Sequence, residues 1–235
     1  MGAIINAVGI VLGSVVGLLF GKAISEKLQE TLLAGMGIFV ALTGVVDFLK
    51  TENSLIPLLG LVIGTVIGQL LKIEERTESF GGWLQSKYAK VTHGSQNESR
   101  ERFINGFVTA ALLFVIGPMG VLGSIQEGLG QGITTILAKS LIDCLTSVAL
   151  TSAMGIGVGF SAIPVLIYQG AITLLAVQAD KILTDTMINE MTACGGIMLV
   201  AIGMNSLLRI KKISVANMQP GLIIAPLLAY IASLF

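Results

Sequence analysis

The stretch FINGFVTAALLFVIGPMGVLGSIQEGLGQGITTILAKSLIDCLTSVALTSAMGIGVGFSAIP (103–164) decides the fold of this chain. Two apolar runs are joined by the glycine-rich segment GPMGVLGSIQEGLGQG (117–132), and a second glycine-rich segment, GIGVGFSAIP (155–164), closes the stretch. Between these segments lies a helix-like run that carries Lys139 and Asp143. Charged residues inside apolar helices persist only when they have partners, so this run is the first place to look for a site.

The composition indicates a membrane protein. Apolar residues make up 54% of the 235-residue chain and charged residues only 12%, against roughly a quarter charged residues in a soluble domain. Mean hydropathy is +0.89. We therefore expect an all-α, polytopic protein of the inner (plasma) membrane, in contact with the lipid bilayer and forming one transmembrane domain over 1–235. The formal net charge is zero and no nucleic-acid-binding motif is present, so nucleic acid is not expected as a partner.

At roughly 20 residues per span, the apolar runs divide the chain into eight predicted spans. They are 2–21, 31–49, 55–71, 103–122, 132–152, 161–179, 191–208 and 219–235. The first run follows Met1 without a basic region or a cleavage pattern, so we interpret it as a permanent span. It carries glycines four residues apart in the sequence, which share one helical face and let another backbone approach closely. These residues are Gly9, Gly13, Gly17 and Gly21.

The one long polar stretch, 72–102, is predicted to be a connector. Its first part, 74–90, places aromatic residues at helical spacing next to lysines, which is typical of a helix lying in the membrane interface. The pair Gly81-Gly82 weakens this helix prediction. The second part, 92–102, is polar and indicates a solvated linker.

The distribution of basic residues predicts the orientation. With eight spans, eleven of the fourteen Lys and Arg residues fall in links on one side, two fall on the other, and Lys139 lies inside a span. The positive-inside rule then places the 72–102 connector in the cytoplasm and both termini outside the cytoplasm. An odd number of crossings within 103–160 would reduce this asymmetry to nine against four, so the even number is favoured.

The sequence also contains an apparent repeat. The segments SEKLQETLLAGMGIFVALTG (25–44) and TDTMINEMTACGGIMLVAIG (184–203) align without gaps at an offset of 159, and IPLLGLVIG (56–64) is similar to APLLAYIAS (225–233). Spans one to three are therefore predicted to repeat as spans six to eight. Because the step is five spans, the two copies would face opposite ways. Inverted repeats around interrupted helices are a signature of secondary transporters. Independent helices of similar composition are the alternative.

Lys139 and Asp143 are the leading site candidates. They are four residues apart and share a helical face, with the hydroxyl of Ser140 nearby. A charge at the bilayer centre costs roughly 2.5–3.5 kcal/mol on insertion scales, and a pair facing a polar cavity avoids much of that cost. We interpret the two residues as a proton or ion relay or as a counter-charge for a polar substrate. A structural ion pair between helices explains them equally well.

The glycine-rich segment 117–132 could offer backbone groups to a ligand. Pro118 removes a donor and breaks a helix, and Gly117 lets the chain turn, so non-helical backbone is expected here. Such backbone occurs at membrane depth only where it is buried in protein or lines water. Glu127 would lie near the tip of the segment. A re-entrant hairpin and a plain external loop both explain the pattern.

Polar residues in the other spans are weaker candidates, because such residues join helices more often than they bind ligands. They are Asn6, Asp47, Gln69, Asn105, Gln169 and Asn205. We include Asn105 and Gln169 in the predicted substrate or ion site. Two cysteines and one histidine form no metal-binding pattern, so no metal or cofactor is expected. Neither a nucleophile–base set nor a nucleotide motif is present, so the chain is not predicted to be an enzyme.

Four segments carry a resemblance to a known family. They are GSVVGLLFGK (13–22), FVIGPMGVLGSIQEGL (114–129), AKSLIDC (138–144) and IYQG (167–170). Their order is similar to that in the YqgA/YdfK-like family of bacterial multi-spanning membrane proteins, and the resemblance covers nearly the whole chain. It implies a polytopic membrane protein, and it implies no established activity.

These observations together predict a small secondary transporter or ion-coupled carrier of a small solute or ion. Its site would lie near the broken segments of spans four to six. A channel is the alternative within transport. A membrane scaffold or sensor that acts through 72–102 is the alternative from another functional class. The glycine-faced helices also favour a homodimer.

Overall fold

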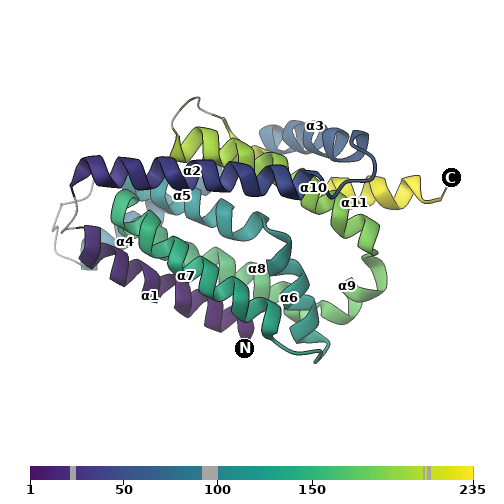
Figure 1. Ribbon diagram of the computed structural model, residues 1–235, viewed down its shortest axis with the longest axis horizontal. Helices are drawn as coiled ribbons and strands as arrows, with labels where there is room; N and C mark the ends of the chain where they lie inside the picture. The colour runs from purple at the N-terminus through teal and green to yellow at the C-terminus, as the bar shows by residue number, and fades with distance from the viewer. Residues whose placement is uncertain (22–24, 92–99, 209, 211–212, 235) are drawn as a thin grey trace.

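The computed structural model describes residues 1–21, 25–91, 100–208, 210 and 213–234, and all regular structure in them is helical (Figure 1). The α-helices are α1 (Gly2–Gly21), α2 (Glu26–Phe48), α3 (Leu55–Leu70), α4 (Ile73–Val91), α5 (Arg100–Ile116), α6 (Pro118–Gly128), α7 (Thr134–Met154), α8 (Ala162–Leu174), α9 (Ala176–Ile182), α10 (Asp185–Ile202) and α11 (Gly221–Ala232). Shorter turns of 3-10 or π helix are η1 (Ile156–Ser161), η2 (Gly203–Leu207) and η3 (Val215–Met218). Residues 92–99 of the predicted linker and the basic residues Lys22, Arg209, Lys211 and Lys212 lie outside the described residues.

Within the described ranges, six helical stretches are long and apolar enough to cross a membrane. They are Gly2–Gly21, Glu26–Phe48, Thr134–Met154, Ile156–Leu174, Asp185–Asn205 and Val215–Ala232. Two further pairs qualify only as bent units: α3 with α4, bent by 57°, and α5 with α6, bent by 59°. The predicted fold class is confirmed: the protein is all-α with six spans, or eight when each bent pair counts as one.

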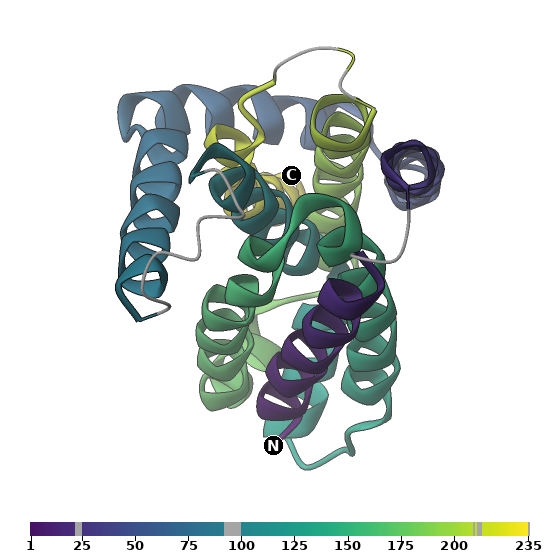
Figure 2. The same cartoon turned by 90° about the vertical axis from the view of Figure 1, so that its left-hand side faces the viewer.

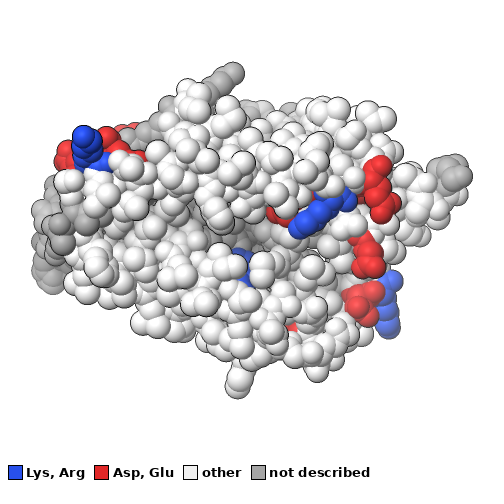
Figure 3. All heavy atoms as spheres, in the orientation of Figure 1, with Lys and Arg blue, Asp and Glu red and all other residues white. Residues whose placement is uncertain are grey.

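The outer surface is that of a protein embedded in lipid. Large apolar side chains are exposed along α1, α2, α3, α7 and α11. Figure 3 shows most charged atoms of one face gathered toward the two ends of the long axis, with few charged atoms in the broad belt between them. Soluble proteins rarely expose continuous apolar surface of this extent.

The glycine face predicted on the first span packs against α7. A Cβ atom at Gly13 or Gly17 would overlap the carbonyl oxygen of Cys144 or Val148, respectively, so only glycine lets these backbones touch. Because later residues of α1 meet later residues of α7, the two helices are parallel. On its other side α1 contacts α8, which runs antiparallel to it, and Figure 2 shows α1 between the two helices.

Two further helix pairs are antiparallel. Gly44 of α2 lies against Gly196 of α10, and Gly37 lies against Gly203 just beyond the end of α10. The helices α3 and α11 are also antiparallel to each other. Together with the parallel α1 and α7, these directions agree with the alternation of eight spans. Figure 2 shows α2 at the edge of the molecule, consistent with its many exposed apolar side chains.

Two local predictions require correction, and one uncertain helix is present. Most of the segment expected to be non-helical, 117–132, is helix α6, because Pro118 occupies the first helical position, where a missing N–H costs nothing. The break is confined to Gly117, whose extended backbone (φ −70°, ψ 142°) separates α5 from α6. The helix predicted over 74–90 is present as α4, and Gly81-Gly82 lies inside it, next to Phe107 and Arg100. The span predicted over 161–179 divides into α8 and α9 after Leu174.

Candidate functional site

An ion pair lies within the transmembrane helix α7, as predicted. Lys139 Nζ is 2.5 Å from Asp143 Oδ2, and the two residues are only 5% and 4% exposed. They are one helical turn apart, so the helix itself brings them together. The ring of Phe114 lies on another side of the ammonium group, with its centroid 5.9 Å from Nζ, which is close enough for a cation–π contact.

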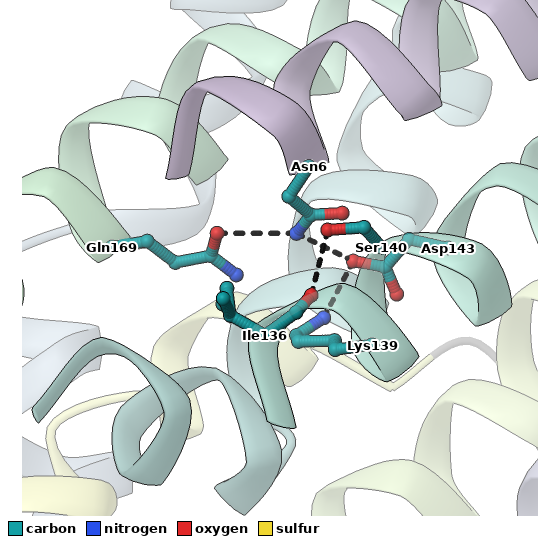
Figure 4. A network of polar contacts seen from close by, with 6 residues as sticks. All are labelled: Asn6, Ile136, Lys139, Ser140, Asp143 and Gln169. Atoms are coloured by element: carbon teal, nitrogen blue, oxygen red, sulfur yellow. Dashed lines mark hydrogen bonds and ion pairs between the residues drawn. The ribbon is translucent and has the colours of Figure 1, made fainter. Parts of the chain in front are cut away.

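Two amide side chains complete the cluster from neighbouring helices (Figure 4). Asn6 of α1 donates from Nδ2 to Asp143 Oδ2 at 2.9 Å and to Gln169 Oε1 of α8 at 3.1 Å. Both amides are fully buried. We call Asn6, Lys139, Asp143 and Gln169 the polar cluster. It joins α1, α7 and α8 at one point. Asn6, which the sequence placed among the weaker candidates, bonds to both Asp143 and Gln169 and lies at the centre of the cluster.

The polar cluster retains unused hydrogen-bonding capacity. Within the part of the chain that the structure describes, neither Asn6 Oδ1 nor Gln169 Nε2 has a hydrogen-bond partner, although both atoms are buried. One is an acceptor and the other carries two donor hydrogens. An unpaired buried polar group costs about 1–3 kcal/mol. The cluster can therefore accept a ligand group, or water, that both donates and accepts.

The α5–α6 break brings backbone to this cluster. Gly120 lies in the first turn of α6, and a Cβ built there would be 3.1 Å from Lys139 Cε and 3.4 Å from Gln169 Nε2. The absence of a side chain at Gly120 thus lets Lys139 and Gln169 pack directly against the backbone of α6. Figure 3 shows the molecular face hollowed between α2 and α7, with basic atoms visible in the hollow. The Lys139 side chain itself retains 7% of its surface.

The other predicted site residues make no hydrogen bond to the polar cluster within the described structure. Ser140 is buried beside the pair, but its hydroxyl donates to Ile136 O in the same helix, at 2.7 Å. Gly117 and Pro118 form the half-buried corner between α5 and α6. Asn105 is exposed on α5 and does not join the cluster, because the next residue, Gly106, packs against Met154 at the other end of α7 from Lys139.

Glu127 is also outside the polar cluster. It lies at the end of α6, where its carboxylate pairs with the N-terminal ammonium group and accepts from Gly2 N at 2.5 Å. Thr173 of α8 donates to the same carboxylate at 3.4 Å. Glu127 therefore anchors the start of α1 to α6 and α8, and it is not the tip of a loop.

Sequence reasoning missed two sets of buried polar groups. Glu190 of α10 is fully buried and accepts from the Thr51 hydroxyl at 2.6 Å and from Glu52 N at 3.1 Å, which fixes the α2–α3 loop. Four buried hydroxyls on α1, α7 and η1 form the second set. On α7 they continue the four-residue spacing of the ion pair, and that spacing is the signal that could have found them. They are Ser14, Ser147, Thr151 and Ser161.

Comparison with known proteins agrees with this architecture. The family model described as "Protein of unknown function (DUF554)" matches residues 1–230. The chain is 31% identical over 238 residues to the "Uncharacterized membrane protein YdfK" of Bacillus subtilis (strain 168), covering 100% of this chain and 97% of that protein. It is 28% identical over 225 residues to the "Uncharacterized protein YqgA" of Escherichia coli (strain K12), covering 96% and 94%.

No solved structure matches the chain. The family match spans almost the whole sequence, the relatives are covered nearly end to end, and one of them is named as a membrane protein. The resemblance predicted from four short segments is thereby confirmed. This chain belongs to the DUF554 family and is a membrane protein whose function is unknown.

Proposed function

We propose that the protein is a small ion-coupled secondary transporter of the inner membrane, and that the polar cluster is its binding site for a small polar solute or ion. The observation that carries the proposal is the buried Lys139–Asp143 pair, held at 2.5 Å beside two amides with unused hydrogen-bonding groups. Ionisable groups in membrane spans are costly and commonly mark substrate or ion pathways.

A purely structural pair would give a different pattern. Helix–helix joints made by polar residues satisfy their donors and acceptors against each other. Among the described residues, this cluster leaves one amide oxygen and one amide nitrogen unpaired, next to a helix break where Gly120 supplies no side chain. Broken helices near the middle of the bilayer form the binding sites of many transporters.

The contacts between α2 and α10 support the inverted repeat as part of this proposal. The sequence alignment equates Gly37 with Gly196 and Gly44 with Gly203. In the structure Gly37 packs on Gly203, and Gly44 packs on Gly196. A two-fold rotation that exchanges the two copies would convert the first contact into the second. Antiparallel packing of two glycine-faced helices gives the same contacts, so superposition of spans one to three on spans six to eight is the direct test of the repeat.

The proposed orientation follows from the basic residues. With both termini outside, the α3–α4 corner and the 72–102 connector are cytoplasmic. The polar cluster then lies on the extracytoplasmic side of the Gly13–Gly17 contact, because Asn6 precedes these glycines on α1.

Solid-supported-membrane electrometry on proteoliposomes tests the function without knowledge of the substrate. A panel of amino acids, carboxylates, amines and alkali-metal chlorides is applied to the parent protein. We expect a transient, saturable current with at least one solute, and loss of that current in Asp143→Asn. The matched control is Asp47→Asn. Asp47 is also a buried carboxylate paired with a lysine, Lys50, at 2.6 Å, but it lies at the C-terminal end of α2 and outside the polar cluster.

Each outcome of this experiment has a clear meaning. A current that Asp143→Asn abolishes and Asp47→Asn retains supports a carrier. A sustained current that does not saturate with solute concentration replaces the carrier with a channel. No current with any solute in correctly folded, reconstituted protein contradicts the proposal and favours a scaffold or sensor.

A further inference from the structure

We propose that a monovalent cation, with Na⁺ the best fit, binds among the hydroxyls of Ser14, Ser147, Thr151 and Ser161. This site would lie one to two helical turns from Asp143. The inference deepens the proposed function by naming its coupling ion, and it rests on that function for its role but not for the binding itself.

Two of the four hydroxyls, those of Ser147 and Thr151, extend the polar cluster along α7. Lys139, Asp143, Ser147 and Thr151 occur at every fourth position, so they form one stripe on one face of the helix. Ser147 is fully buried and Thr151 is 1% exposed. The carboxylate of Asp143 is therefore one turn from the first hydroxyl of the site.

Close backbone contacts bring the other two hydroxyls to this stripe. A Cβ at Gly13 would be 3.1 Å from Ser147 Cβ, and Ser14 is the next residue of α1. On the other side of Ser14, a Cβ at Gly159 would be 3.2 Å from its hydroxyl oxygen. Gly159 belongs to η1, which contacts both α1 and α7 and ends at Ser161.

The hydroxyls of this set lack a partner that other helical hydroxyls of the protein have. Seven helical hydroxyls donate to the carbonyl four residues earlier, namely those of Thr31, Thr43, Thr65, Thr77, Ser86, Ser140 and Thr192. None of the four proposed ligands has a hydrogen-bond partner among the residues that the structure describes, although each hydroxyl oxygen is buried. Ser161 even occupies the N-cap of α8 without capping it. Buried polar groups require partners, so a ligand or water belongs here.

The chemistry favours a monovalent cation. Hydroxyl and carbonyl oxygens are hard ligands of the kind that hard cations take. The helix α7 ends at Met154, three residues after Thr151, so the negative end of its dipole is close to the site. The carboxylate of Asp143, one helical turn from Ser147, is already paired with Lys139. This low net charge suits Na⁺ better than a divalent ion, which usually takes several carboxylates.

Asp143 links the proposed cation site to the polar cluster. On α1 and α8, the fully buried Ile10 and Val165 separate the amides from Ser14 and Ser161, so the polar path is continuous on α7 alone. A cation drawn toward Asp143 from this side competes with Lys139 for the carboxylate. Loosening of the ion pair would then free the ammonium group for a solute.

Thermal unfolding of the purified full-length protein tests binding directly, with NaCl compared with choline chloride at equal ionic strength. A ligand that binds only the folded state raises stability with its concentration. We expect Na⁺ to raise the Tm of the parent by on the order of 5 °C at saturating concentrations, and K⁺ to raise it less. The double variant Ser147→Ala, Thr151→Val should lose this shift.

The same variants separate binding from a structural role. Because the removed hydroxyls have no partners within the described structure, the double variant should keep the Tm of the parent in choline chloride. The control Thr192→Val removes a buried hydroxyl that bonds to Ile188 O at 2.7 Å, and it should keep the Na⁺ shift. If the double variant does not fold, Ser14→Ala with Ser161→Ala replaces it, with the same expectation.

The outcomes also separate this proposal from the proposed function. Equal Tm values for the parent in both salts, as water alone in the site would give, overturn the cation site. A Na⁺ shift that survives in the hydroxyl variants does the same. In either case the transport experiment on Asp143→Asn is unaffected. Conversely, a hydroxyl-dependent Na⁺ shift with no solute current would leave the cation site standing without the transporter.

Discussion

Removing one partner of the Lys139–Asp143 pair should destabilise the protein more than replacing both partners together. The groups are 2.5 Å apart and about 5% exposed. In Lys139→Met, Asp143 would keep the bond from Asn6 but lose its counter-charge, and in Asp143→Asn, Lys139 would keep the contact with Phe114 but lose its counter-charge. Removing one partner of a buried pair costs about 3–5 kcal/mol, whereas replacing both groups by neutral ones is often close to neutral.

Thermal unfolding followed by circular dichroism measures this difference. For a chain of this size, 1 kcal/mol shifts Tm by roughly 2–4 °C, so we expect each single variant to lose about 10 °C. The double variant Lys139→Met, Asp143→Asn should lose far less. The control Lys50→Met breaks a pair whose lysine side chain is 45% exposed, and such a pair contributes less than about 1 kcal/mol. A double variant as unstable as the sum of the single variants would refute the reasoning.

Three further predictions follow from individual contacts. Gly13→Ala should destabilise the protein by about 1–3 kcal/mol or more, because its Cβ would overlap Cys144 O. Its control, Gly35→Ala, should stabilise α2 slightly, because a Cβ at Gly35 meets nothing within 4 Å. Urea titration measures the free energy of unfolding of both variants. Glu127→Gln should lower stability by less than about 1 kcal/mol, since its partner ammonium is 96% exposed, and should leave solute currents unchanged. A Ser95→Cys variant should resist an impermeant thiol reagent in intact cells and react after lysis; labelling of intact cells would reverse the proposed orientation.

The sequence was most informative about contacts that form within a single helix. The four-residue spacing of Lys139 and Asp143 placed the ion pair, because helical geometry alone sets that distance. The glycines of the first span predicted a close backbone contact, but they could not name α7 as the partner. That choice depends on the packing of segments about 130 residues apart in the sequence.

The rest of the site depends on contacts between distant segments. Asn6 and Gln169 meet at Asp143 from α1 and α8, and each alone looks like any polar residue in an apolar helix. The glycine-rich segment misled the helix prediction for another reason. Pro118 was interpreted as a breaker, but at the first position of α6 it starts a helix, and it brings Gly120 to Lys139.

The central claim is that the polar cluster binds a transported solute, and the solute-evoked current of the Lys139→Met, Asp143→Asn double variant tests it most directly. This variant is expected to fold, so a lost current cannot be ascribed to unfolding. The account predicts that the current seen with the parent disappears, while the Asp47→Asn control retains it. A folded double variant with the current of the parent would contradict the account and show that the ion pair only holds the helices together.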